Sequence, residues 1–328
     1  MVHEFEKGFS VRQAAWHGLA TVLDNYPGRQ EAMELAGHNF RIVEKKLAGI
    51  EVNPENAIDV GFQPIEGWKA LQRSDTNKII SVVRDTYQVV QNETLWDIVD
   101  MLVDQPHIQY ETAGVLREGA VLWVLAKLDE PITIPGDNTE IYPYVRVSTS
   151  HDGTSANEAA ATMVRVICMN TFQMSDMEGK RTGLTYRFKH TKNAKVKIEE
   201  AKAAIGLVRN QFHAFHDLAS ELAKKPISDA GIRYFLHEFI PDPPAAIETD
   251  RVKKNIEEAR VKVRSILEGD TIAETHRNTA YGLFEAGIEY LDHIRKFRTD
   301  ETYFRRTVID RNTMKGRVIK LALKAAVE

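Results

Sequence analysis

The chain of 328 residues is poor in cysteine, and Cys168 is its only thiol. A single cysteine excludes an intramolecular disulfide and any zinc site built from several cysteines, and it suits a reducing compartment. The N-terminal segment carries acidic residues early and has no apolar core of the kind found in signal peptides. The longest apolar runs, such as Ala120–Ala126, are far shorter than the about 20 residues that span a bilayer. We therefore expect a soluble, cytoplasmic protein without a membrane partner.

The common enzymatic signatures are also missing. The sequence has no Gly-x-x-x-x-Gly-Lys-Ser/Thr phosphate loop, no Gly-x-Gly-x-x-Gly, no His-Glu-x-x-His and no Gly-x-Ser-x-Gly. These absences disfavour the usual nucleotide hydrolases, dehydrogenases and other hydrolases, although a rarer active site stays open. We assign no catalytic residue, metal ligand or cofactor. The net charge of −4 argues against coating nucleic acid through overall charge, but it allows a local basic surface.

Alternating and apolar runs predict a strand-rich N-terminal half. Turns at Ser74–Asn77 and at Glu118-Gly119 are expected to form hairpins, and the passage with Asn53-Pro54, Gly61 and Pro64 is expected to be loop. The run Ala120–Leu128 is almost continuously apolar, which predicts a strand buried on both faces. The predicted strands cover residues 39–47, 68–73, 78–92, 108–117, 120–128, 141–150, 161–167 and 184–191.

Helical periodicity and capping residues predict helices mainly in the C-terminal part. Asn25 and Pro27 should open a short helix that stops at Gly37, and Asn92 should cap the next one. The predicted helices cover residues 27–36, 93–104, 168–177, 194–225, 228–239, 245–267, 271–297 and 300–327. The expected architecture is therefore α+β, with a mainly antiparallel sheet domain over residues 1–192 and a helical domain over residues 193–328.

The sharpest short pattern is His151-Asp152-Gly153-Thr154. A histidine and a carboxylate at a strand end could act as acid and base or as metal ligands, with His17 as a further member. Asp-Gly between two strands is, however, a strong turn signal, and adjacent strand residues point to opposite faces. We favour the turn and keep a site of His17, His151 and Asp152 as the alternative.

Two other candidates are better explained by packing. Cys168 follows an apolar run, which is typical of a small buried residue rather than a nucleophile. His213, His216 and Asp217 lie at helical spacing but alternate with apolar side chains, and no third histidine or cysteine accompanies them. For these three residues we favour packing or solvent exposure over metal binding.

Positive charge is more informative, because it is concentrated between Arg181 and Lys202. A strand that offers cations for phosphates and nearby aromatic rings for bases suits single-stranded nucleic acid. Alternation on residues 141–150 puts Tyr142, Tyr144, Arg146 and Ser148 on one face, which could extend this surface. The candidate contacts are Arg146, Arg165, Arg187, Lys189, His190 and Lys192 for phosphate, and Tyr144 and Tyr186 for bases. A second basic region, between Arg295 and Lys320, is better explained as solvated helix faces.

Several segments occur in a recognisable order: Trp16-His17-Gly18, TYQVVQNETLWDIVD, ETAGVLREGAVLWVLAKL, STSHDGTSA, VRVICMNT, RFKHTKN and NTAYGLFEAGIEYLDHIRKFR. This order resembles the phage/plasmid-like protein family, which comprises proteins of bacteriophages, plasmids and integrated elements, largely of undefined function. The resemblance covers nearly the whole chain, with Phe172 where the family commonly has leucine. It implies a bacterial host cytoplasm and brings no established active site. The order of hairpins before a long helix is also similar to the ring-forming single-strand annealing proteins Redβ and RecT.

The sequence therefore predicts a non-enzymatic protein that binds single-stranded DNA. A narrower version of this prediction is an oligomeric annealase in recombination or replication. A homo-oligomer is expected. Two alternatives stay open: a metal-dependent or His/Asp-based enzyme of a mobile element, and a protein-binding module that acts on host factors through the helical half.

Overall fold

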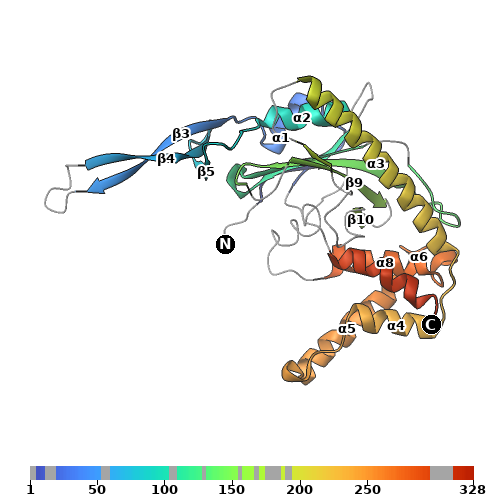
Figure 1. The fold of residues 1–328 in the computed structure, drawn as a ribbon. Coiled ribbons are helices and arrows are strands. Elements are labelled where there is room, and N and C mark those ends of the chain that lie inside the picture. The colour runs from blue at the N-terminus through green and yellow to red at the C-terminus, as the bar shows by residue number, and fades with distance from the viewer. Residues whose placement is uncertain are drawn as a thin grey trace. The chain divides into compact units, whose positions relative to one another are not determined.

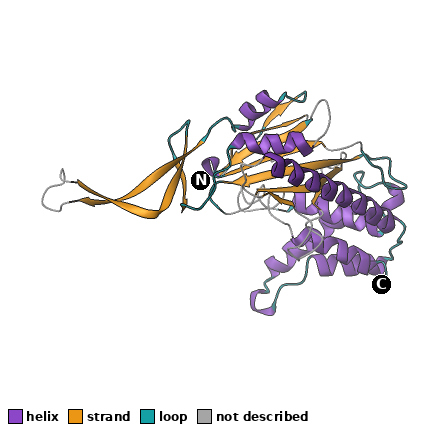
Figure 2. Ribbon diagram, turned by 45° about the horizontal axis from the view of Figure 1, so that its top comes forward, coloured by secondary structure: helices purple, strands orange, loops and turns teal. Residues whose placement is uncertain are grey.

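A computed structural model describes residues 5–11, 20–52, 60–102, 109–127, 131–153, 157–165, 170–173, 186–188, 194–295 and 313–328 (Figure 1). The chain splits into two compact units. The first unit contains Met1–Lys127, Arg146–Ala159 and Arg187–Ala204, and the second contains Leu128–Val145, Ala160–Tyr186 and Ile205–Glu328. The predicted α+β class is confirmed: the sheets are mainly antiparallel, and the C-terminal region is helical (Figure 2).

The larger sheet has the strand order β10-β9-β8-β7-β6-β1-β2, and β11 pairs with β9. In this sheet β1 pairs antiparallel with β6, β6 with β7 and β9 with β10, whereas β1 and β2 run parallel. The strands are β1 (Phe5–Val11), β2 (Thr21–Leu23), β6 (Tyr110–Leu116), β7 (Val121–Lys127), β8 (Ile141–Ser150), β9 (Asn157–Arg165), β10 (Asn170–Gln173) and β11 (Tyr186–Phe188).

The hairpin predicted at Glu118-Gly119 joins β6 to β7 and is confirmed. Both Glu118 (φ 54°) and Gly119 (φ 101°) have positive φ. A Cβ on Gly119 would lie 2.9 Å from the ring of Phe40, so the close approach of this ring requires glycine. The prediction that the second strand is buried is also confirmed, since β7 is buried from Val121 to Ala126.

A second, three-stranded antiparallel sheet has the order β3-β4-β5, formed by Ile42–Val52, Val60–Arg73 and Ile79–Arg84. The predicted turn at Ser74–Asn77 lies between β4 and β5, as expected. The loop predicted around Gly61 and Pro64 is wrong, because β4 runs through both residues. Pro64 pairs with Ala48 of β3, at a point where β4 has no pairing with β5. A strand tolerates proline where one of its edges has no hydrogen-bonding partner.

Two helices cover the sheet of the first unit: α1 (Arg29–Ala36) packs on β1 and β6, and α2 (Asn92–Leu102) packs on β7. The predicted stop at Gly37 is confirmed by its left-handed conformation (φ 72°). The predicted start is wrong, because Gly28 is the N-cap and Asn25 lies outside the helix.

The C-terminal helices are α3 (Ala194–Ala223), α4 (Asp229–Phe239), α5 (Asp250–Leu267), α6 (Ala280–Glu289) and α8 (Thr313–Ala325). In the second unit α8 packs against α4 and α6, around the buried rings of Phe235, Phe239 and Phe284. The long proline-free helix and the start at Ser228, whose Oγ accepts from Gly231 N, are confirmed.

Two predicted helices are wrong, one in the C-terminal part and one before α3. The one expected from residue 271 starts only at Ala280, because Thr279 provides the N-cap. It continues into a π-helical turn, Tyr290–Ile294. The short helix expected at 168–177 is contradicted by β10, whose residues pair with β9 from Asn170↔Arg165 to Gln173↔Thr162. None of the helices in the described part of the chain has the length and apolar content needed to cross a membrane.

Candidate functional site

Arg146 is enclosed within the first unit rather than presented on a surface. Only 2% of the residue is exposed. Its Nη1 donates to Ser148 Oγ at 2.8 Å, and its Nη2 donates to Glu158 Oε1 at 2.9 Å. On the polar face predicted for this strand, the guanidinium of Arg146 is thus engaged in an internal ion pair with Glu158 and a hydrogen bond to Ser148.

The other proposed DNA contacts are only partly described. Tyr144, in the second unit, is also buried. The backbone of Arg165 ends β9, and Tyr186 and Arg187 belong to β11, which pairs with β9. Three further predicted contacts, Lys189, His190 and Lys192, lie outside the described residues, and so do His17 and Cys168.

His151 and Asp152 have separate partners. The ring of His151 is buried, and its Nε2 lies 2.9 Å from Asn92 Oδ1. The carboxylate of Asp152 instead forms an ion pair with Arg117 Nη1 at 3.2 Å. Gly153 has φ 73°, the left-handed conformation of a turn glycine. This division of partners fits the turn interpretation of the pattern.

Asn92 connects this histidine to the segment that joins α1 to β3. Its Nδ2 donates to the carbonyl oxygens of His38 and Phe40 at 2.9 and 2.8 Å. Because both donated bonds fix the amide, Oδ1 must accept from His151, whose Nε2 therefore carries a hydrogen. The sequence predicted a helix cap from Asn92, but its side chain makes these long-range bonds.

His38 forms the second half of the buried network. Its Nε2 lies 2.8 Å from Gly114 O, and its Nδ1 lies 3.2 Å from Trp96 Nε1. Since a carbonyl only accepts and an indole only donates, His38 is neutral with its hydrogen on Nε2. Burial, together with a smaller effect of the nearby His151, lowers the pKa of His38 to about 4. The network holds α1, α2, β6 and the His151 turn together.

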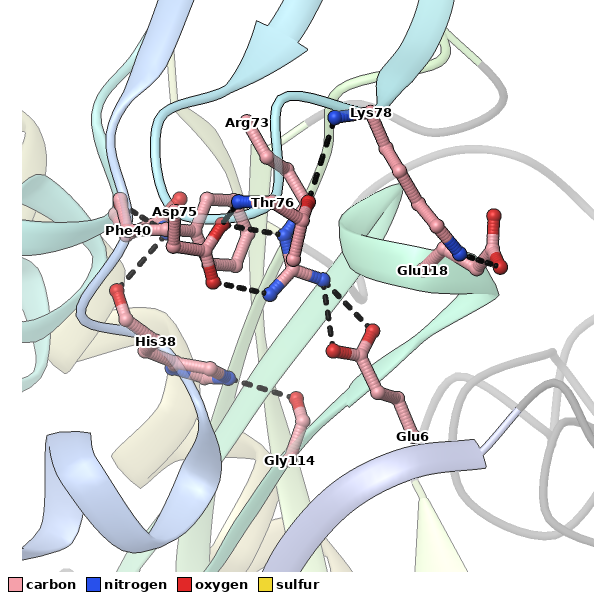
Figure 3. A network of polar contacts seen from close by, with 10 residues as sticks. Glu6, His38, Phe40, Arg73, Asp75, Thr76, Lys78, Gly114 and Glu118 are labelled. Atoms are coloured by element: carbon pink, nitrogen blue, oxygen red, sulfur yellow. Dashed lines mark hydrogen bonds and ion pairs between the residues drawn. The ribbon is translucent and has the colours of Figure 1, made fainter.

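Arg73 anchors the three-stranded sheet to the N-terminal strand (Figure 3). Its Nη1 donates to both carboxylate oxygens of Glu6, at 2.8 and 2.7 Å, and its Nε and Nη2 donate to Asp75. The guanidinium also lies 4.0 Å from the centre of the Phe40 ring. The hydrogen bond from Arg73 lowers the pKa of Asp75. These contacts fix the base of the β3–β4 pair and are structural.

Beyond this base, β3 and β4 form a two-stranded segment, which we call the ribbon: residues 48–52 and 60–64 (Figures 1 and 2). Ile50 is 64% exposed and Phe62 is 69% exposed. This surface was not predicted, because a loop was expected at Gly61 and Pro64. The signal was present, because apolar residues alternate at Ala48, Ile50 and Val52 and again at Val60, Phe62 and Pro64.

Part of the second basic region is internal to the second unit. Lys315 and Asp292 are each 1% exposed, and their charged atoms lie 2.6 Å apart. Among the described residues, no group of three or more histidine, cysteine or acidic side chains is arranged to hold a metal ion. His213 is exposed, and His216 lies 3.5 Å from its neighbour Asp217.

Comparisons with known proteins place the chain in a family. A search of curated proteins found no match, and a search of solved structures found none either. The family model described as "Domain of unknown function (DUF932)" matches residues 79–313, well over half of the chain. This span includes α2, most of the larger sheet and helices α3 to α6. The chain therefore belongs to the DUF932 family, a family of phage/plasmid-like proteins.

Proposed function

We propose that this protein is a non-enzymatic, single-stranded-DNA-binding protein of a phage or plasmid, with an oligomeric annealase as one form. The observation that supports it best is the pairing of β11 with β9. This pairing brings the backbone of the Tyr186–Phe188 segment, with Arg187 at its centre, beside the strand that ends at Arg165. The chain then continues through Lys189, His190 and Lys192 into α3.

The chemistry of this segment suits a flexible polyanion. Lysine and arginine neutralise phosphates, and aromatic rings stack on unpaired bases without sequence preference. A net charge of −4 for the whole chain makes such binding depend on the local basic segment. Because Arg146 is paired with Glu158, the proposal rests on Arg165, Arg187, Lys189, His190 and Lys192, with Tyr186 as the stacking ring.

Fluorescence anisotropy of a labelled single-stranded oligonucleotide tests the proposal. Affinity should fall steeply with salt, with a slope of log K against log salt of about −0.7 per neutralised phosphate. A duplex of the same sequence should bind more weakly, because its bases are not free to stack. Failure to bind single strands even at low salt would refute the proposal.

A matched pair of triple variants locates the surface. Changing Arg187, Lys189 and Lys192 to alanine should weaken binding and reduce the salt slope by about two. The control changes Lys253, Lys254 and Lys262 to alanine, which removes the same charge from exposed positions of α5. Equal losses in both variants would show that net charge, rather than this segment, causes binding.

Protein–protein association is a second candidate function. The specific observation in its favour is the exposure of Ile50 and Phe62 on the ribbon, since large apolar side chains gathered on a surface mark interaction sites.

A further inference from the structure

The three-stranded sheet β3-β4-β5 (Figure 1) has an inner face and an outer face. Ile42, Leu71 and Val83, one from each strand, project to the inner face and are buried. On the same face Ser81 Oγ donates to the carbonyl oxygen of His151 at 2.6 Å, which ties this face to the turn after β8. Because alternate residues of a strand project to opposite sides, the sequence neighbours of these residues form the outer face.

Strand pairing shows which side chains share the outer face. On the central strand β4, Ala70 pairs with Lys45 of β3 and with Val82 of β5, and Trp68 pairs with Arg84 of β5. Lys45, Trp68, Val82 and Arg84 are all exposed, Trp68 by 37%. We call these four residues the outer patch. Ala70 is only 2% exposed, so the larger side chains around it close over the middle of the sheet.

Trp68 and Arg84 form a stack within the outer patch. The central carbon of the guanidinium lies 4.0 Å from the centre of the indole ring. Trp96 and Trp123 are fully buried, so among the described tryptophans only Trp68 presents its ring to solvent. A guanidinium that stacks on a ring keeps N–H groups at its edge to donate to phosphate, and both flat groups can stack on an unpaired base.

The two cations of the outer patch, Lys45 and Arg84, have no ion-pair partner among the described residues. Glu44, which precedes Lys45 in β3, projects to the inner face and lies 3.1 Å from Lys69. An exposed cation without an acidic partner can neutralise a phosphate and release the counterions bound to it. The outer patch therefore offers both of the groups that a single strand needs, cations and a flat ring.

Two exposed acids adjoin the outer patch in the sequence. Asp85 follows Arg84, so the alternation of the strand turns it to the other side. Glu66 precedes Trp68 by two residues and counts against a polyanion. Arg41, directly before β3, is an exposed cation that offsets this charge. The outer face therefore keeps the positive charge of its two cations.

We propose that the outer patch is a second contact for single-stranded DNA, in addition to the basic segment around Arg187. One base stacks on Trp68 and Arg84, and the cations Lys45 and Arg84 bind the neighbouring phosphates. This contact, which rests on the proposed function, extends it to the N-terminal part of the chain.

The arrangement of the strands suits one unpaired base. Lys45 and Arg84 lie on the two outer strands of the sheet, about 10 Å apart across it, and Trp68 lies on the strand between them. A base on the indole therefore has a cation on either side for its phosphates. Duplex DNA does not fit this arrangement, because its bases are stacked within the helix and cannot lie on a side chain.

Fluorescence anisotropy of a labelled oligothymidine with the full chain tests the stacking contact. Trp68→Ala should weaken binding about tenfold, and Trp68→Phe, which keeps a flat ring, should recover most of the affinity. Phe62→Ala is the matched control, because Phe62 is an exposed aromatic residue of the same strand outside the outer patch, and it should bind like the wild type. Circular dichroism checks that the variants are folded.

Two neighbouring lysines test the phosphate contact. Lys45→Ala should weaken binding and reduce the salt slope by about 0.7. Lys46→Ala removes the same charge from the opposite face of β3 and should change neither quantity. Both lysines are exposed, so both variants should keep the wild-type unfolding midpoint.

Photo-crosslinking of an oligonucleotide that contains bromouracil, followed by mass spectrometry, should place a crosslink on Trp68. Binding at wild-type strength in both Trp68→Ala and Lys45→Ala would overturn the outer patch as a DNA contact but would leave the proposed function standing. A wild type that binds no single strand would refute both. If Trp68→Ala lost self-association in sedimentation velocity while it bound DNA normally, the outer patch would be a protein contact and the proposal would be wrong.

Discussion

The Oδ1 atom of Asn92 lies 2.9 Å from Nε2 of His151, two side chains separated by 59 positions in the sequence. Both are almost completely buried. Since Nδ2 of Asn92 donates to two carbonyl oxygens, one amide side chain satisfies three polar groups that have no access to water. The start of α2, the segment between α1 and β3, and the turn after β8 are thereby held in one arrangement.

Replacing Asn92 by leucine should lower the free energy of unfolding by about 3 kcal/mol, because it leaves the carbonyls of His38 and Phe40 and the ring of His151 without this partner. Chemical denaturation followed by circular dichroism measures the loss. Asn210→Leu, at an exposed position of α3, is the control and should change stability little. Similar stability of the two variants would show that the Asn92 bonds contribute little.

The stability of the protein should fall as the pH decreases from about 6.5 to about 4. The pKa of His38 is lowered in the folded state, so between these values the unfolded chain binds more protons, and unfolding becomes easier as the pH falls. The expected contribution is about 3 kcal/mol across the interval. His38→Gln should flatten this part of the profile, even if it lowers stability at neutral pH. An unchanged slope in the variant would assign the pH dependence to other groups.

Lys315→Ala should destabilise the second unit by about 3–5 kcal/mol, because it leaves the carboxylate of Asp292 buried without its cation. The double variant Lys315→Met/Asp292→Leu should be closer to the wild type than Lys315→Ala, since it removes both charges. Denaturant unfolding of the three proteins measures this, and Lys320→Ala, at an exposed position of the same helix, is the control. A double variant that is less stable than Lys315→Ala would contradict a coupled pair.

Arg146→Gln should lower stability by about 3 kcal/mol, because Glu158 and Ser148 lose a buried charged partner. Glu158→Gln in the same chain should recover part of the loss. Binding of single-stranded DNA, measured where the variants remain folded, should be unchanged. A specific loss of DNA affinity in folded Arg146→Gln would instead return Arg146 to the binding surface.

Local patterns predicted much of the secondary structure. The hairpins at Ser74–Asn77 and Glu118-Gly119, the helix stop at Gly37 and the start at Ser228 each depend on residues close in sequence. The secondary-structure predictions were wrong where pairing between distant segments decides the conformation. Pro64 lies in a strand because β3 pairs with it, and Asn170–Gln173 is a strand because β9 does. Pairing between distant strands overrides local propensity.

In the candidate site, too, the sequence gives the residue types and only the structure gives their partners. That Arg146 and Lys315 are cationic could be read from the sequence, but their partners Glu158 and Asp292 become neighbours only in the folded chain. The sequence also did not predict that Asn92 bridges buried groups. A helix-capping pattern involves neighbouring residues, whereas Asn92 and His151 are far apart in the chain.

By itself, the sequence determined the α+β class, the hairpin turns at Ser74–Asn77 and Glu118-Gly119, the helix stop at Gly37, the helix start at Ser228 and the order of segments shared with the family. These features depend on side-chain periodicity and local backbone preference. Only the tertiary structure decided which charges are exposed and which are paired inside, and that an expected loop is a ribbon with an apolar face. The physical reason is that burial and ion pairing depend on distances between residues far apart in the chain, which no local pattern encodes.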